Sequence, residues 1–176
     1  MDLNKLTTGD RIVAISAIVF LIAMFLPWYG LDSDFGDANR NGFDYFFFGW
    51  IPLLLALAMA VQIALARFTT TEMPKVGSLT WGQVHLILGG LAAVLVLLRL
   101  LITDSVSAFG VDLGDLDRKF GLFVAMIAAL GLVAGAFLKM QDPADAGAAG
   151  GPAAPPPPPA PPTTPPTTPP TTPPTA

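Results

Sequence analysis

Very few side chains in the apolar parts of this chain could do chemistry. Arg99, His85 and Gln62 stand out, because polar residues within long apolar stretches usually bind a substrate, relay protons or pair with one another. His85 is the only histidine, and a histidine can carry protons near neutral pH. A proton path also needs acidic relay residues, and no Asp or Glu occurs between the ends of any predicted helix. We therefore interpret His85 as a hydrogen-bonded or interfacial residue that could join a polar cluster with Ser16, Gln62 and Gln83.

Arg99 lies near the end of its apolar stretch, where a long cationic side chain can reach the membrane surface. Two carboxylates could pair with it: Asp104, just beyond the same stretch, and Asp44, at the start of another. We favour a structural anchor, and a substrate-binding arginine is the alternative.

One loop resembles the beginning of a calcium-binding loop. Asp37, Asn39, Asn41 and Gly42 follow the pattern D-x-N-x-N-G, in which alternate oxygens converge on a hard cation and the glycine permits a sharp bend. The match fails where a bidentate glutamate belongs, because that position is Phe48. An ordinary turn is the favoured interpretation, with Asp37, Asn39 and Asn41 as a weak candidate metal site.

The sequence lacks the residues that most enzymes need. It has no cysteine, and no nucleophile, general-base pair or metal cluster can be assembled from it. We expect no enzymatic activity and no cofactor. The chain also has no basic patch, so nucleic-acid binding is not expected.

Four long apolar stretches must position the polar residues. The chain is 53% hydrophobic and only 12% charged, which is far from the composition of a soluble domain. A hydrocarbon core about 30 Å thick requires about 20 helical residues. The sequence therefore predicts an all-α membrane protein, with a bundle of four transmembrane helices at about 11–29, 45–66, 81–102 and 120–139 within a domain over 1–141. Trp28 and Tyr29, which follow the first run, are typical of an interfacial aromatic belt rather than of a signal-peptide cleavage site.

Small residues are expected to hold the helices together, because lipid tails give large apolar side chains no reason to leave the membrane. The fourth stretch is the best packing surface, and the third has a similar pair. Either the other helices or a second copy could lie against them. The candidates are Gly121, Ala125, Gly131, Gly135, Gly89 and Ala93.

The distribution of lysine and arginine predicts the orientation. With the N-terminus in the cytoplasm, Lys5, Arg11, Arg67, Lys75 and Lys139 lie inside, against three outside, namely Arg40, Arg118 and Lys119. Both termini are then cytoplasmic, and the outer loops are rich in aspartate. Residues 142–176 are almost entirely Pro, Ala, Thr and Gly, which predicts a disordered tail with polyproline II character.

Several segments together resemble a known group of proteins. GDRIVAISAIVFLIAMFLPWYG, NGFDYFFFGW and RKFGLFVAMIAALGLVAGAFL resemble small four-helix membrane proteins of actinobacteria, which share a FLPWYG-like end to the first helix and often carry a zinc ribbon or a Pro-rich tail. The resemblance covers residues 9 to about 140 and implies a multi-pass protein of a bacterial plasma membrane. It implies no activity, and this chain has no cysteines for a zinc ribbon.

Two functions fit these features. We favour a non-enzymatic membrane scaffold or accessory subunit, in contact with lipid and with a protein partner or a second copy, whose Pro-rich tail is a flexible tether. The alternative is a small transporter or channel with Arg99, His85 and Gln62 along its route. Broken helices and acidic relays, which such routes ordinarily use, are not evident in the sequence.

Overall fold

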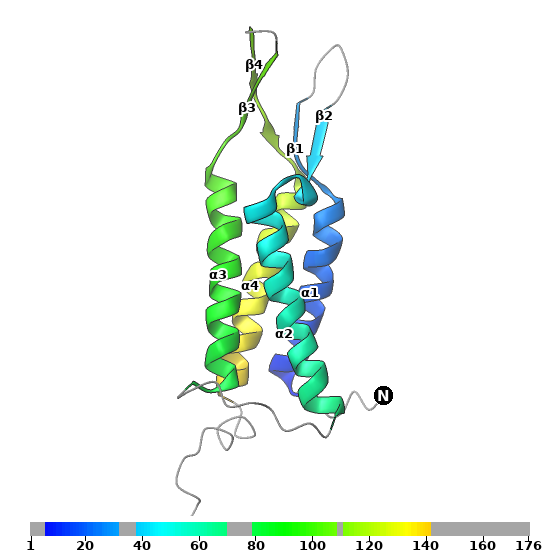
Figure 1. The fold of residues 1–176 in the computed structure, drawn as a ribbon, viewed down its shortest axis with the longest axis vertical. Helices are drawn as coiled ribbons and strands as arrows, with labels where there is room; N and C mark the ends of the chain where they lie inside the picture. Colours follow the sequence, from blue (N-terminus) through cyan, green and yellow to red (C-terminus); the bar gives the residue numbers. More distant parts are fainter. Residues whose placement is uncertain (1–5, 32–37, 70–78, 109–110, 142–176) are drawn as a thin grey trace, which may run out of the picture.

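The computed structural model describes residues 6–31, 38–69, 79–108 and 111–141, and these form one helical bundle with strands at one end (Figure 1). The bundle contains α1 (Thr8–Phe25), α2 (Ile51–Phe68), α3 (Trp81–Leu101) and α4 (Phe120–Met140). All four are long and apolar enough to cross a membrane, α2 together with the short helix before it. The four apolar helices expected from the sequence are confirmed.

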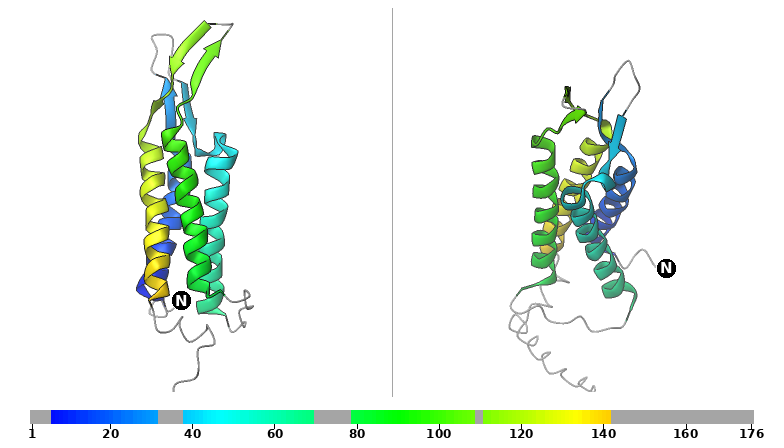
Figure 2. Two further views of the ribbon diagram at one scale, coloured as in Figure 1. Left: turned by 90° about the vertical axis from the view of Figure 1, so that its left-hand side faces the viewer. Right: turned by 45° about the horizontal axis from the view of Figure 1, so that its top comes forward.

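The two ends of the bundle differ. At one end, which we call the terminal end, α1 begins and α4 finishes. The other end, which we call the strand end, carries the strands β1 to β5 of the described residues (Figures 1 and 2). The tail at 142–176 lies outside the described residues.

Side-chain size separates the inside of the bundle from its outside. Large apolar side chains point outward from all four helices, such as Ile18 (59% exposed), Leu54 (55%), Ile87 (57%) and Ile127 (69%). Many of the buried positions are small: Ala17, Ala56, Ala92, Ala125, Ala129 and Ala136. This arrangement suits helices surrounded by lipid, because small inward residues allow the backbones to approach closely.

The tightest helix contact joins α1 to α4 through glycine. A Cβ atom built on Gly9 would lie 2.7 Å from the carbonyl oxygen of Gly135, and one built on Gly135 would lie 2.9 Å from the backbone nitrogen of Val13. Further along the same contact, Gly131 faces Ser16, and Gly121 lies against Leu26 and Pro27. The glycines of α4 therefore pack against the chain's own first helix and the residues that follow it.

We expect Gly135→Ala to destabilise the bundle by about 1–3 kcal/mol, because the new methyl group must displace backbone atoms of α1. Alanine is the better helix former, so Gly90→Ala provides the matched control: a Cβ there meets nothing within 4 Å. Unfolding in detergent should show a loss for the first variant and none for the second. Equal stabilities of the two variants would contradict the α1–α4 contact.

The strand end forms two small antiparallel sheets, a feature not expected from the sequence. One has the order β2–β1–β5, made of Ala38–Asn41, Pro27–Leu31 and Asp117–Arg118; the other is a hairpin of β3 (Ser105–Ala108) and β4 (Val111–Asp115). Gly114, with φ of 106°, lies at the bulge of this hairpin. The all-α expectation therefore holds for the helical bundle but not for the segments that connect the helices at this end.

The first helix is shorter at its far end than the sequence indicated. It ends at Phe25, and Trp28 and Tyr29 lie in β1 with no exposed surface. The expectation that they belong to an exposed aromatic belt is wrong. The indole nitrogen of Trp28 donates to the carbonyl of Ala23 at 2.8 Å, which satisfies its polar atom inside the protein.

Two short helices lead into α2. These are a 3₁₀ turn at Gly42–Asp44 and a π-helical turn at Phe46–Trp50. Asn41 begins the first: its side-chain oxygen accepts from the backbone N–H of Phe43 at 3.0 Å, and its own N–H donates to Asp44 at 2.8 Å. Asp44 is therefore engaged locally.

Candidate functional site

A buried arginine organises the strand end. Arg99, at the end of α3, is only 3% exposed, and both of its terminal nitrogens donate to the carboxylate of Asp104. Its guanidinium carbon lies 4.3 Å from the ring centre of Tyr29 and 3.9 Å from that of Tyr45. The guanidinium of Arg99 is thus held by an ion pair and by two aromatic rings. Both the ion pair and the cation–π contacts are favourable for a guanidinium that is removed from water. Of the two candidate partners, the structure selects Asp104.

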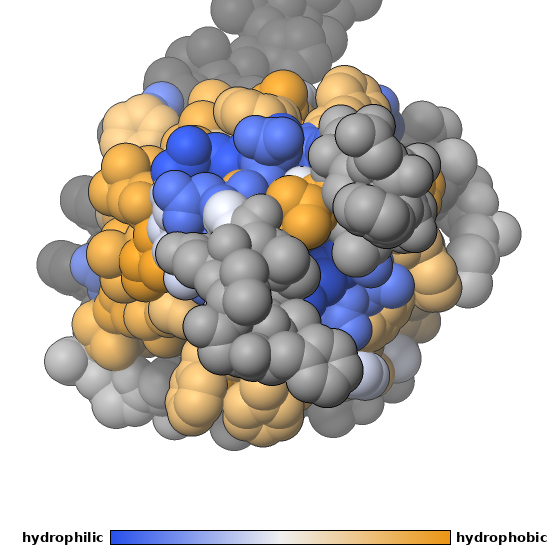
Figure 3. Space-filling view, turned by 90° about the horizontal axis from the view of Figure 1, so that it is seen from above, coloured by the Kyte–Doolittle hydropathy of each residue, from blue (hydrophilic) through white to orange (hydrophobic). Residues whose placement is uncertain are grey.

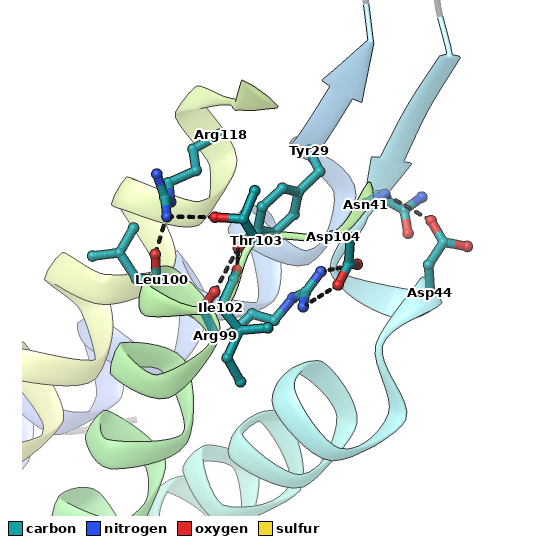
Figure 4. Close-up of polar contacts among 9 residues, drawn as sticks. All are labelled: Tyr29, Asn41, Asp44, Arg99, Leu100, Ile102, Thr103, Asp104 and Arg118. Atoms are coloured by element: carbon teal, nitrogen blue, oxygen red, sulfur yellow. Dashed lines mark hydrogen bonds and ion pairs between the residues drawn. The ribbon is translucent and has the colours of Figure 1, made fainter. Parts of the chain in front are cut away.

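The last carbonyl groups of α3 are satisfied by side chains from other segments. The hydroxyl of Tyr29 donates to the carbonyl of Arg99 at 2.5 Å and to that of Ile102 at 3.1 Å (Figure 4). Arg118 donates to the carbonyl of Leu100 at 2.7 Å and to the hydroxyl of Thr103 at 2.9 Å. Such carbonyls have no partner within a helix, so these bonds cap α3 and fasten β1 and β5 to it.

This set of residues, Arg99, Asp104, Tyr29, Tyr45 and Arg118, is called the strand-end clamp below. It joins the end of α3 to the segments after α1, before α2 and before α4. Tyr45 also stacks on Trp28, with ring centres 6.3 Å apart. The clamp therefore fixes the strands to the bundle. Seen from this end, hydrophilic residues gather over the middle of the bundle and hydrophobic ones surround them (Figure 3).

The clamp keeps Tyr29, Tyr45 and Asp104 in their ordinary charge states. Burial raises the pKa of Tyr29 and that of Tyr45, so both phenols remain protonated. Hydrogen bonds from Arg99 lower the pKa of Asp104, which remains a carboxylate. None of these three groups is thereby prepared to exchange a proton near neutral pH.

We expect Asp104 to make the protein sensitive to acid within a defined range. Its pKa is lower in the folded state, so its contribution is present above the unfolded value of about 3.9 and is lost as the pH falls through that value and the folded one. The difference in stability between the wild type and Asp104→Asn should stay constant from about pH 7 to 5 and shrink below about 4. A difference that stayed constant to about pH 3 would contradict the ion pair.

A second ion cluster lies at the terminal end. The carboxylate of Asp10, on α1, has no exposed surface; it accepts from Nε of Arg67 on α2 at 2.7 Å and lies 3.1 Å from Nζ of Lys139 on α4. Lys139 is only 2% exposed. One carboxylate thus binds cations from two other helices. We call Asp10, Arg67 and Lys139 the terminal ion cluster.

The polar cluster expected around His85 does not form as proposed. His85 is 1% exposed, and neither of its ring nitrogens has a hydrogen-bond partner in the part of the chain that the structure describes. Gln83 instead caps the start of α3, where its side-chain oxygen accepts from the backbone N–H of Thr80 at 2.9 Å. Ser16 packs against Gly131, and Gln62 is half-buried on α2. His85 is therefore buried, and no described residue forms a hydrogen bond with its ring.

The remaining candidate residues have structural positions. Asn39 lies in β2 opposite Gly30, and Asn41 caps the following turn. Asp37, the first residue of the candidate metal site, lies outside the described residues, so that site stays a prediction. Within 6–31, 38–69, 79–108 and 111–141, no group of three or more His, Asp or Glu side chains could hold a metal ion. On α3, Gly89 lies against Leu132 and Val133 of α4, and Ala93 is half-buried.

Sequence reasoning missed two kinds of residue. Asp10 does not stand out in the sequence, and Lys139 is notable there only for the orientation that it indicates. The alternating direction of the helices brings the start of the first and the end of the fourth to one end. In the sequence, Tyr29 is typical of an interfacial aromatic residue, and Tyr45 lies in a run of similar aromatics. The aromatic spacing around the first outer loop offered no signal that an arginine 70 residues after Tyr29 lies between them.

Comparison with known proteins adds no relative. No protein-family model, curated protein or solved structure matches this chain.

Proposed function

We propose that this chain is a non-enzymatic integral membrane scaffold or accessory subunit that presents the strand end to a partner protein. The observation that carries this proposal is the strand-end clamp, which fastens the segment after α1, the entry to α2 and the strand before α4 to one end of α3. Strands attached in this way form a fixed surface outside the apolar helices. Fixed surfaces lose less conformational entropy when a partner binds.

The interior of the bundle supports a scaffold over a transport route. Most inward side chains between the two ion clusters are apolar, the exceptions being Ser16, Gln62 and His85. The apolar ones are Phe20, Met24, Leu53 and Val96 nearer the strand end, and Val13, Met59, Ile63 and Leu132 nearer the terminal end. Arg99 and His85 lie on opposite sides of this apolar region. A route lined by both would have to pass through packed apolar side chains, which is costly for an ion.

The surroundings of the protein are also part of the proposal. The large apolar side chains exposed on the outside of the bundle support contact with lipid, and the excess of Lys and Arg favours a cytoplasmic position for the terminal end and for residues 142–176. The Pro-rich segment then serves as a tether. A bacterial plasma membrane follows from the resemblance to actinobacterial proteins. The glycines of α4 are used within the chain, so a homo-oligomer would need another surface.

Site-specific crosslinking in membranes tests the proposal. A photoreactive residue at Asn39 or Asp117, both exposed at the strand end, should give discrete protein adducts, whereas one at Ile18, on the outward face of α1, should react mainly with lipid. Removing residues 142–176 should leave the strand-end adducts unchanged if the tail acts only as a tether. Strand-end sites that give no adduct, together with ion or solute flux through the reconstituted protein, would favour the transporter instead.

A further inference from the structure

His85 is buried at the contact between α3 and α4. A Cβ on Gly82 would lie 2.9 Å from a side-chain atom of Met140, and one on Gly89 would lie 3.3 Å from backbone atoms of Leu132 and Val133. His85 lies between these two glycines on the buried face of α3. Its ring therefore faces the last two turns of α4 and has no hydrogen-bond partner among the described residues, an unusual position for a buried polar side chain.

Charges of both signs act on the ring. Lys139 on α4 and Asp10 on α1 both act on His85 electrostatically. The only charged residue of α2 is Arg67, which is ion-paired with Asp10. The only charged residue of α3 is Arg99, at the far end, and the turn at Phe46–Trp50 has none. Asp10 is thus shared by two cations before His85 takes up a proton.

A proton on His85 would add a third cation to a buried region in which two cations already share the carboxylate of Asp10. Burial of a charge without a partner is strongly unfavourable. Protonation of His85 therefore stabilises a state in which water reaches the ring, relative to the packed state. An imidazole in water titrates near pH 6.5, so this stabilisation of the open state increases as the pH falls from about 7.5 to 5. The neutral ring has no such penalty.

We propose that the protonation of His85 controls the packing of α3 on α4 at the terminal end. The neutral ring allows the two helices to pack together, and the protonated ring separates them there. The strand-end clamp holds the other end of α3, so the opening is confined to the terminal end. This separation of the helices is independent of the scaffold function and responds to the pH on the side of the membrane that the terminal end faces.

Spin labels measure the separation directly in the full chain in lipid nanodiscs. The chain has no native cysteine, so labels attach only at introduced ones. Ile87→Cys with Phe137→Cys marks α3 and α4 near the terminal end, and Leu101→Cys with Phe123→Cys marks them near the strand end; all four side chains are exposed. The first distance should lengthen by several ångströms between about pH 7.5 and 5, and the second should stay constant.

The single histidine makes the assignment unambiguous. Its imidazole NMR signal should change with the same midpoint as the first distance, and His85→Leu should abolish the lengthening. The proposal is overturned if the distance stays constant while the signal reports protonation, if the ring stays neutral to about pH 5, or if the leucine variant opens equally. The two wild-type measurements decide the matter even if that variant does not fold.

Discussion

Asp10→Asn should be among the most damaging single substitutions in this protein, at about 3–5 kcal/mol of unfolding free energy. The change keeps the size and most of the polarity of the side chain but removes its charge. Lys139 and Arg67 then stay beside one another at the end of the bundle without the carboxylate that both contact. Breaking a buried pair from one side is costly because the remaining charge stays in a poorly solvating environment.

Two further variants separate the charge effect from a general loss of packing. Asp117→Asn, which changes an exposed carboxylate, should be nearly neutral. Asp10→Asn combined with Lys139→Met should recover part of the lost unfolding free energy, because one of the two cations that Asp10 contacts is then absent. Reversible unfolding in mixed micelles measures all three. Additive losses in the double variant would mean that Asp10 and Lys139 do not stabilise one another.

Arg99→Met should detach the strands from the end of α3 while leaving the helices folded. We expect the free energy of unfolding to fall by roughly 3 kcal/mol. The estimate combines a charge-assisted hydrogen-bonded pair, worth about 1.5–3 kcal/mol, with cation–π contacts of up to about 2 kcal/mol, reduced because Asp104 is partly solvated. Methionine fills part of the volume but cannot hold Asp104, Tyr29 and Tyr45 together. The strands at this end should then become accessible to protease and to hydrogen exchange.

The specificity of this effect depends on the planar guanidinium. Arg99→Lys should rescue poorly, because an ammonium cannot both bind Asp104 through two nitrogens and lie flat between two rings. Arg40→Met, at an exposed position in β2, is the control and should leave exchange unchanged. Unchanged protection of β1 and β5 in the Arg99→Met variant would show that other contacts hold the strands.

The helices could be predicted because their signal is local. Each apolar stretch is long enough to span a membrane, and this property depends on composition alone. The residues at which each helix begins and ends are harder to predict. α1 begins at Thr8 because Thr7 and Asp10 form a capping box, which extends the helix beyond the apolar run into a polar segment.

The contacts at the two ends could not be predicted from composition, because they depend on the register between helices. Close approach at Gly9 and Gly135 sets how α1 lies against α4, and this places Asp10 beside Lys139. At the other end, the pairing of β1 with β2 and β5 turns Tyr29 inward toward Arg99. The strands themselves are short and contain little alternation, so the segments were interpreted as loops.

The most direct test of the account is to determine on which side of the membrane each end lies. The chain has no cysteine, so Asn39→Cys at the strand end and Gln141→Cys at the terminal end can each be labelled alone by a membrane-impermeant maleimide; both positions are exposed. We expect the first to react in intact cells and the second only after the membrane is permeabilised. Reaction of both positions from the same side, or the reverse pattern, would contradict a four-span scaffold that presents its strands outside the cell.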